Sequence, residues 1–378
     1  MTLGVGMVGH AFMGAAHSQA WRTAGRFFDL PLTPDMAVLC GRDGAAAQAA
    51  AVRLGWRHVE TDWKELLTRD DVQLVDVCTP GDVHAEIAVA ALDAGKHVLC
   101  EKPLANTVDE ARAMVAAAER AQANGVRSMV GFNYRRVPAV TLARRLVEQG
   151  RIGQVRHVRA TYLQDWIVDP DAPLVWRLQA DRAGSGALGD IGAHVVDLAQ
   201  YVTGDRLTGV CGLTETFVRE RPLPSGEGRG AVTVDDAALF LGRFGGGAVA
   251  SFEATRFATG RKNQIRLEVN GSTGSLAFDF EQMNELQFFD GTDDPDVAGF
   301  RRIIVTEASH PYTAAWWPPG HGLGYEHTFT HEIVDLVRDL AAGTDPVPSF
   351  ADGLQVQLVL DAVSRSAAAG SQWKEIDR

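Results

Sequence analysis

Asp190, His194 and Lys102 have the types and spacing needed to act on an alcohol. Asp190 and His194 lie four residues apart at the start of a segment that predicts a helix, so both share one helix face. A neutral imidazole, with an ordinary pKa of about 6.5, is a natural proton acceptor. On spacing alone, a surface histidine near a helix N-terminal acid is the simpler interpretation. Lys102 follows an apolar, strand-like run, where open α/β sheets bind their ligands.

A glycine-containing turn follows the first apolar run of the chain. The pattern Gly9-x-Ala11-x-x-Gly14 is similar to the dinucleotide fingerprint G-x-G-x-x-G, with alanine at its second position. In that fingerprint the glycines allow a tight turn and a close approach to the pyrophosphate, which sits at a helix N-terminus. An ordinary strand–helix turn is the alternative, but the position at the head of a strand–helix series favours nucleotide binding.

The end of the second apolar run bears on the choice of cofactor. Gly41 leaves space there, and Arg42 offers a guanidinium suited to the 2′-phosphate of NADP. Asp43 follows and is suited to the ribose hydroxyl of NAD. The sequence therefore predicts NAD or NADP, with a small preference for NADP.

The composition excludes several functional classes. The formal net charge of −12 predicts an acidic surface, so neither nucleic acid nor an anionic membrane is an expected partner. The 4 cysteines lack C-x-x-C spacing, and no H-E-x-x-H occurs, which predicts reduced thiols and no metal site. No apolar run approaches the ~20 residues that a bilayer requires, and the N-terminus lacks a basic signal region. We expect a cytoplasmic protein.

The first third of the chain alternates short apolar runs with helix-like segments. This pattern predicts a Rossmann-type, doubly wound parallel sheet that is buried on both faces. The expected strands are Leu3–Val8, Met36–Cys40, Leu74–Cys78, His97–Cys100 and Val126–Phe132. Helices are expected at about 15–24, 45–54, 84–94 and 107–124, the last of them opened by a capping box.

Beyond residue 152 strands follow one another without intervening helices. This predicts an α+β domain with a large open, mostly antiparallel sheet. The expected strands are 155–164, 210–218, 232–244, 247–256, 264–269, 275–280 and 286–289, with exposed hairpin loops at 222–230 and 290–299. Helices are expected at about 190–202, 326–342 and 352–369. We therefore predict a Rossmann domain over residues 1–132, and a substrate-binding and oligomerisation domain over 133–378 that includes the C-terminal helices.

Four motifs together resemble the Gfo/Idh/MocA family of oxidoreductases. They are the glycine turn, a T-P-x-x-x-H run that starts at Thr79, the E-K-P run Glu101-Lys102-Pro103, and the segment from Gly186 to His194, which is similar to G-G-x-x-D-x-G-x-H. Further segments resemble the levoglucosan dehydrogenase-like sugar dehydrogenases: 133–136, 161–166, 176–177, 183–190 and 324–325. Ala11 and the pair Gly81-Asp82 depart from the family pattern and bear on cofactor affinity.

The resemblance implies an NAD(P)-dependent dehydrogenase that acts on a secondary hydroxyl of a sugar, anhydrosugar or polyol. It implies His194 as general base, assisted by Lys102 and Asp190, although Lys102 and His194 can exchange these roles. Lys102 would bind the reacting hydroxyl, and Glu101 would lie beside the nicotinamide ribose. The implied cofactor-binding residues are Gly9, Ala11, Phe12, Met13, Gly14, Gly41, Arg42, Thr79, Pro80, His84, Glu101, Lys102, Asn133, Trp176 and Arg177. The implied substrate-binding residues are Lys102, Tyr134, Gln164, Trp166, Asp190, His194 and Tyr325.

Two other functions stay open. One is a non-catalytic protein that senses a nucleotide and a sugar on the same fold. The other is an enzyme that oxidises a sugar transiently to allow elimination or epimerisation. For the leading function the expected partner is a small sugar or polyol, and the outer face of the open sheet predicts a homodimer or homotetramer. The aromatic loop Trp316–His321 is a candidate lid or subunit contact.

Overall fold

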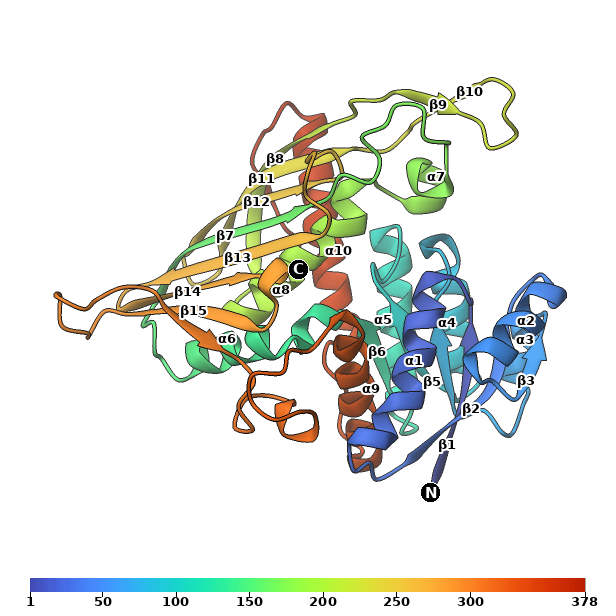
Figure 1. Ribbon diagram of the computed structural model, residues 1–378. Helices are drawn as coiled ribbons and strands as arrows, with labels where there is room; N and C mark the ends of the chain where they lie inside the picture. The colour runs from blue at the N-terminus through green and yellow to red at the C-terminus, as the bar shows by residue number, and fades with distance from the viewer. Residues whose placement is uncertain (378) are drawn as a thin grey trace. The chain divides into compact units, whose positions relative to one another are not determined.

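The computed structural model describes residues 1–377 and divides into two compact units (Figure 1). The first unit comprises Met1–Arg136 and Gly324–Leu354, and the second comprises Val137–Leu323 and the chain from Gln355 onward. The sequence predicts residues 324–354 as part of the second domain. Their place in the first unit follows from α9 (Tyr325–Ala342), which buries Phe329 and packs against α1 (Phe12–Phe27). Amphipathic periodicity predicts such a helix, but it does not identify the surface that the helix covers.

The first unit contains a six-stranded parallel sheet with the order β3-β2-β1-β4-β5-β6. Its strands are β1 (Thr2–Val8), β2 (Thr33–Cys40), β3 (His58–Glu60), β4 (Leu74–Val77), β5 (His97–Glu101) and β6 (Ser128–Gly131). All four residues of β4 are buried, as expected for a strand covered on both faces. The predicted doubly wound sheet is confirmed, and the short edge strand β3 is an addition to it.

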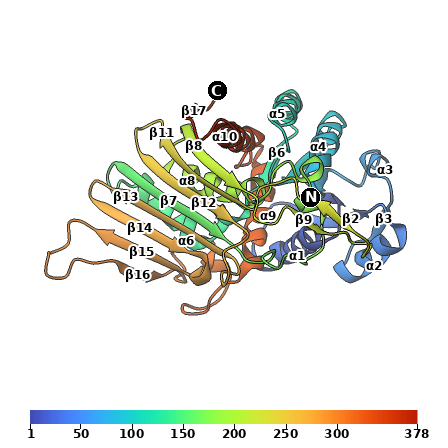
Figure 2. The same cartoon turned by 90° about the horizontal axis from the view of Figure 1, so that it is seen from above.

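Helices cover both faces of this sheet. In Figure 2, α4 (His84–Asp93) and α5 (Val108–Gln122) lie on one side, and α1 and α9 lie on the other. Two further helices, α2 (Gly44–Leu54) and α3 (Trp63–Leu67), flank β3 in the chain. The predicted capping box opens α5, since the Thr107 hydroxyl accepts from the Glu110 N–H and the Glu110 carboxylate accepts from the Thr107 N–H.

The second unit contains a nine-stranded sheet with the order β16-β15-β14-β13-β7-β12-β11-β8-β17. Every neighbouring pair is antiparallel except β7 with β12, so the predicted open, mostly antiparallel sheet is confirmed. Its strands are β7 (Val155–Leu163), β8 (Leu207–Glu215), β11 (Ala237–Phe244), β12 (Val249–Thr255), β13 (Gln264–Gly271), β14 (Gly274–Asp279), β15 (Glu285–Asp290), β16 (Arg301–Ile304) and β17 (Lys374–Glu375). The exposed hairpin loop expected at 222–230 is present, and it joins the antiparallel strands β9 (Glu220–Pro222) and β10 (Arg229–Ala231).

One face of the large sheet is covered by helices. These are α6 (Pro138–Glu148), which the sequence analysis missed, α8 (Ala193–Thr203) and the second-unit part of α10 (Phe350–Ala368) (Figure 1). Residues alternate along β11, where Phe240 and Phe244 are buried while Leu239 and Leu241 are exposed. The opposite face therefore keeps apolar side chains at its surface.

Two expectations drawn from composition bear on the fold. No helix within residues 1–377 is both long and apolar enough to cross a membrane. All four cysteines are free thiols, and Cys40, Cys78 and Cys100 are buried.

Candidate active site

The glycine turn lies at the C-terminal end of β1, in a geometry that suits an anion. Gly9 has a φ of +101°, and a Cβ there would lie 2.7 Å from the carbonyl oxygen of Cys78. A Cβ on Gly14 would lie 2.2 Å from the Gly9 carbonyl oxygen, so the helix and the strand approach closely only because this residue is glycine. No side chain caps α1 at Ala11, which leaves the first N–H groups of the helix for a ligand. These features fit the pyrophosphate of a dinucleotide.

The T-P-x-x-x-H loop follows β4 and is tied to the E-K-P loop by His84. The buried His84 ring has its Nδ1 3.0 Å from the Pro103 carbonyl oxygen and its Nε2 2.9 Å from the Thr79 carbonyl oxygen. His84 therefore fixes one loop against the other. The Thr79 hydroxyl oxygen is buried and has no hydrogen-bond partner within residues 1–377, which fits a site whose ligand completes its polar contacts. Pro80 follows it and precedes the short helical turn Gly81–Val83.

The residues that bear on cofactor choice lie at the end of β2. Arg42 is exposed, and the Asp43 carboxylate accepts the Ala46 N–H at 3.0 Å as the N-cap of α2. A Cβ on Gly41 would lie 2.6 Å from Cδ2 of His10, so the imidazole of His10 lies against this glycine. Asp43 thus has a capping role in addition to any contact with a ribose.

The E-K-P motif sits at the end of β5 on a buried support. One carboxylate oxygen of Glu101 lies 3.0 Å from Nε2 of His17, and the other accepts the Lys102 N–H at 3.0 Å. Lys102 itself is half-buried. Asn133, which follows β6, donates from Nδ2 to the Thr328 hydroxyl at 2.8 Å and so joins this strand end to α9.

An aromatic cluster forms around Tyr325, the first residue of α9. Its ring lies 6.2 Å from Phe12 in a stacked arrangement, 6.3 Å from Tyr134 and 5.0 Å from Phe329. Burial raises the pKa of Tyr325, so its phenol stays protonated. The Phe12 ring is 65% exposed and offers an apolar face at the first turn of α1. Met13, beside it, is half-buried.

In the second unit, Asp190 and His194 lie on consecutive helical turns of different kinds. Asp190 is in a π-helical turn, Leu188–Gly192, and His194 is in α8, which begins directly after it. The sequence predicted a regular helix over both residues. A wide π turn instead changes the direction of the side chains that it carries relative to those of a regular α-helix. Such turns are frequent at functional sites.

Asp235 holds this turn in place. Its two carboxylate oxygens accept the N–H groups of Gly186 and Leu188, each at 2.7 Å. A Cβ on Gly186 would lie 1.7 Å from the Asp235 carbonyl oxygen, so only glycine allows this approach. The glycine of this motif is therefore explained by packing against the loop that precedes β11.

Arg256 connects several of the predicted site residues and was missed by the sequence analysis. It is fully buried at the end of β12, with Nη1 3.8 Å from the Asp190 carboxylate and Nη2 donating to the Asp235 carbonyl oxygen at 3.0 Å. Its guanidinium also donates to the Arg177 carbonyl oxygen and lies 5.6 Å from the ring of Trp166. An arginine at a strand end is typical of a surface residue, so no local pattern in the sequence indicated that Arg256 is a buried support of the site.

His194 lies in a polar and aromatic setting. It is 6% exposed, and its ring lies 5.8 Å from the ring of Tyr162. The Tyr162 hydroxyl and the Gln164 amide both donate to Oδ1 of Asn263, at 2.7 Å each. Asn263 is a second residue that the sequence analysis missed.

The predicted site residues form one group in each unit. The first unit holds the nucleotide turn, the loops after β2, β4, β5 and β6, and the aromatic cluster with Tyr134 and Tyr325. The second unit holds Gln164, Trp166, Asp190, His194 and the stacked pair of Trp176 and Arg177, whose guanidinium lies 4.4 Å from the indole. The structure thus presents a nucleotide-binding group and a group of proton-transfer and hydrogen-bonding side chains.

Comparison with known proteins connects both groups to one family. Residues 3–132 match the oxidoreductase family with an NAD-binding Rossmann fold, and residues 140–277 match the GFO/IDH/MocA C-terminal domain. The levoglucosan dehydrogenase of Pseudarthrobacter phenanthrenivorans is 44% identical and aligns over 99% of this chain and 98% of its own.

Solved structures give the same result. A crystal structure of an oxidoreductase domain protein from Kribbella flavida is 70% identical, with a TM-score of 0.98 over 100% of both chains. The structure of levoglucosan dehydrogenase in complex with NADH and levoglucosan is 43% identical, with a TM-score of 0.96 over 100% of both chains. The small preference for NADP, inferred from Arg42, finds no support in these relatives.

The motifs, the two sheets and the comparisons agree, and the predicted oxidoreductase activity and family are confirmed. The chain belongs to the Gfo/Idh/MocA family of oxidoreductases.

Proposed function

We propose that this protein is an NAD-dependent dehydrogenase that oxidises a secondary hydroxyl of a sugar, with an anhydrosugar such as levoglucosan as the first candidate. The main supporting observation is that the E-K-P strand end and the Asp190–His194 turn are both present, each on its own buried support. The similarity to a levoglucosan dehydrogenase whose structure holds NADH and levoglucosan supports the substrate class.

The proposed chemistry divides among three side chains. The nicotinamide, when bound, supplies the acceptor for the carbinol hydride. His194 accepts the hydroxyl proton as general base, and Asp190 orients it or holds the substrate. Lys102 donates a hydrogen bond to the reacting oxygen and stabilises the negative charge that develops there.

Cofactor and sugar would be held by the remaining residues of each group. The turn from Gly9 to Gly14 suits the pyrophosphate, and beside it Thr79 offers a hydroxyl that has no hydrogen-bond partner within residues 1–377. Trp166 and Tyr325 offer aromatic faces to sugar C–H groups, and Gln164 offers an amide to sugar hydroxyls. We propose NAD as the cofactor, because the family's first domain is described as NAD-binding.

The test is a steady-state screen of both cofactors against anhydrosugars, hexoses and polyols, followed by two variants. Lys102→Met and His194→Asn should each lower kcat/KM by about 100- to 10,000-fold. If both groups act in one chemical step, kcat/KM of the double variant should be only a little lower than kcat/KM of the less active single variant. NADH binding, followed by fluorescence, serves as the folding control for His194→Asn.

Two outcomes would favour the other functions. Product formed from a sugar with no net change in nicotinamide absorbance indicates transient oxidation for elimination or epimerisation. Tight NADH and sugar binding without turnover, with cellular function intact in Lys102→Ala, indicates a sensor.

We also propose that the outer face of the nine-stranded sheet joins copies of this chain into a homodimer or homotetramer. Leu239 pairs with Leu213 across β11 and β8, and Leu241 pairs with Cys211. The three leucines are between 41% and 57% exposed, and together they form an apolar patch on a sheet face that no helix among the described residues of the second unit covers. A cytoplasmic location, the other prediction from composition, is supported by the free thiols.

A further inference from the structure

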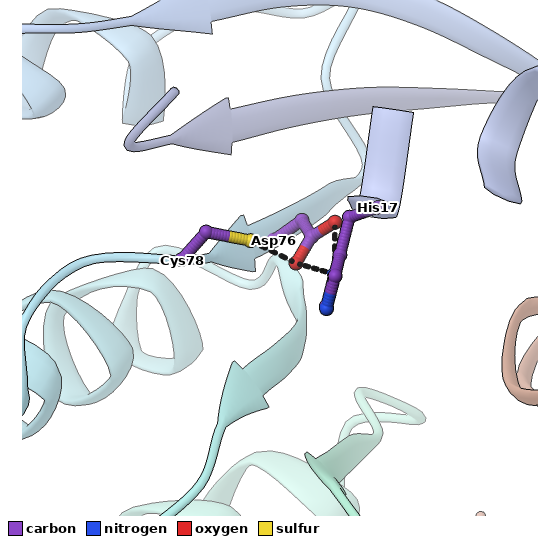
Figure 3. Close-up of side chains that lie close together, drawn as sticks. All are labelled: His17, Asp76 and Cys78. Carbon is purple, nitrogen blue, oxygen red and sulfur yellow. Dashed lines mark hydrogen bonds and ion pairs between the residues drawn. The ribbon is translucent and has the colours of Figure 1, made fainter. Parts of the chain in front are cut away.

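A buried cluster of charged side chains lies directly behind the E-K-P motif. Figure 3 shows His17 from α1 pointing at Asp76 on β4, with Cys78 beside the same carboxylate. Nδ1 of His17 lies 3.0 Å from both Asp76 oxygens, and Nε2 lies 3.0 Å from Glu101. All of these side chains are buried. A single imidazole thus bridges two carboxylates from neighbouring strands.

Hydrogen-bond capacity determines the charge state of this histidine. A neutral imidazole has one N–H donor and one acceptor nitrogen, so one of the two carboxylates would face a lone pair. An imidazolium donates to both, and these charge-assisted bonds are the strong kind. Burial by itself lowers the pKa of His17, but the charge of Asp76, the interaction with Cys78 and the hydrogen bonds to the ring together outweigh it and raise the pKa well above the ordinary value.

We propose that His17 is a positioning residue for the dehydrogenase reaction, because as a buried imidazolium it fixes Glu101 and through it the backbone of Lys102. The connection is continuous: His17 binds one oxygen of Glu101, and the other oxygen accepts the Lys102 N–H at 3.0 Å. The inference rests on the proposed function, in which Lys102 contacts the reacting oxygen. A shift of about 1 Å in such a group is enough to cost about 100-fold in rate.

A metal ion is the competing explanation of this cluster. Single ligand atoms of His17, Asp76 and Cys78 all lie within 4.8 Å of one another. However, the Cys78 thiol donates to the Asp76 carboxylate at 3.4 Å, whereas a metal would require this sulfur as a thiolate. Asp76 also accepts the indole N–H of Trp21 at 2.7 Å. The hydrogen-bonded imidazolium therefore accounts for the lone pairs of Asp76 without an ion.

The surroundings of His17 define which groups affect its titration. Asp76 faces His17 from β4, and Cys78 faces it from the loop that follows β4. Glu101 and Cys100 face His17 from β5. From α9, the ring of Phe329 lies 5.4 Å away, and Glu332 is a further buried carboxyl group whose charge interacts with His17. All five polar neighbours are carboxyl or thiol groups, which are neutral or negative and never positive, so none competes for the positive charge.

The charge state is tested directly, without reference to activity. Histidine labelled with ¹⁵N should give one resonance pair with imidazolium shifts that persists at pH 8, and it should disappear in His17→Gln. A neutral His17 at pH 7 would overturn the proposal. So would a stoichiometric metal in the purified protein that is absent from His17→Gln.

Kinetics test the positioning role. In His17→Gln, kcat should fall about 10- to 100-fold while KM for the sugar and the affinity for NADH stay within about threefold. Asp76→Asn should change kcat in the same direction, which keeps the test valid if one variant folds poorly. The matched control is His331→Gln, which removes another buried histidine of the same unit whose Nδ1 faces the Arg136 carbonyl oxygen.

The positioning role would be contradicted if kcat of His17→Gln were no lower than kcat of His331→Gln. Failure of the proposed function looks different, since the parent protein would then lack dehydrogenase activity while the ¹⁵N measurement still reports on His17.

Discussion

Glu332, on α9, is a buried carboxyl group whose environment opposes its ionisation. It is 0% exposed, and neither of its oxygens has a hydrogen-bond partner within residues 1–377. Burial raises the pKa of Glu332 to about 8, although Arg136 and His17 favour its charged form. At neutral pH the group is therefore largely protonated, beside the charged cluster around His17.

The pH dependence of stability follows from this pKa. In the unfolded chain a glutamate ionises above about pH 4.3, so between there and pH 8 the folded state holds the extra proton. Stability consequently falls as pH rises through this window, by at most about 1.4 kcal/mol per pH unit for one proton. Above pH 8 Glu332 is ionised in both the folded and the unfolded state, so the loss of stability caused by its buried charge no longer increases.

Glu332→Gln should therefore be more stable than the parent, and its advantage should grow between pH 5 and pH 8. The uncharged amide keeps the shape of the side chain without the cost of a buried charge. Thermal unfolding midpoints of both proteins at pH 5, 6, 7 and 8 measure the difference. An advantage that is constant across this range would contradict the assigned titration.

Single residues also show which roles were accessible from the sequence. The capping pair Thr107 and Glu110 was predicted and is present, because a cap is a local contact. The catalytic roles of Lys102, Asp190 and His194 stay predictions. His84 was expected to bind cofactor, but its ring nitrogens face two backbone carbonyl oxygens, so its observed contacts hold loops together.

At the scale of elements, the π turn Leu188–Gly192 depends on two side chains from elsewhere in the second unit. Asp235 accepts backbone N–H groups of the turn entrance, and Arg256 lies beside the Asp190 carboxylate. Arg256 is fully buried and Asp235 is half-buried, so the turn is held against the sheet rather than by its own helix propensity.

Arg256→Lys should lower kcat/KM for the sugar about 10- to 100-fold and leave NADH affinity unchanged. A lysine keeps the charge but lacks the planar fork that reaches the Asp235 and Arg177 carbonyl oxygens and lies over Trp166. Steady-state kinetics with varied sugar, together with NADH titration, separate the two effects.

Arg261→Lys is the matched control for this prediction. Arg261 is a neighbouring surface arginine that pairs with Glu281 at 3.0 Å, so its replacement should change neither quantity. If Arg256→Lys weakens NADH binding while the sugar kinetics stay intact, the support role assigned to Arg256 is wrong.

At the scale of the whole molecule, the uncovered face of the nine-stranded sheet is the main feature without a function inside one chain. Leu241 lies on β11, the third strand from one edge of the sheet, and is 57% exposed. Replacing it by glutamate places a charge in the proposed interface, where desolvation is costly.

Leu241→Glu should therefore convert the oligomer to a monomer, as measured by light scattering after size exclusion. Val52→Glu is the control, since Val52 is 75% exposed on α2 in the other unit and should leave the oligomer intact. A parent protein that is itself monomeric at micromolar concentration would refute the interface.

The sequence by itself determined the order and type of most elements and the identity of the motif residues. Alternating and continuous apolar runs report burial locally, so β1, β4 and five strands of the large sheet, β7 and β12 to β15, were predicted close to their observed bounds. The short strands β16 and β17 were not predicted, and β8 and β11 were predicted with bounds shifted by three to five residues. The glycine turn was also readable, because only small residues fit a close strand–helix approach.

The tertiary structure alone decided which residues support the site. The bridge from His17 to Asp76 and Glu101 joins positions 59 and 84 residues apart, and Arg256 reaches Asp190 across a similar interval. It also decided that residues 324–354 complete the first unit. Local patterns encode whether a side chain is buried, but the partner that satisfies a buried charge is set by how distant strands and helices pack.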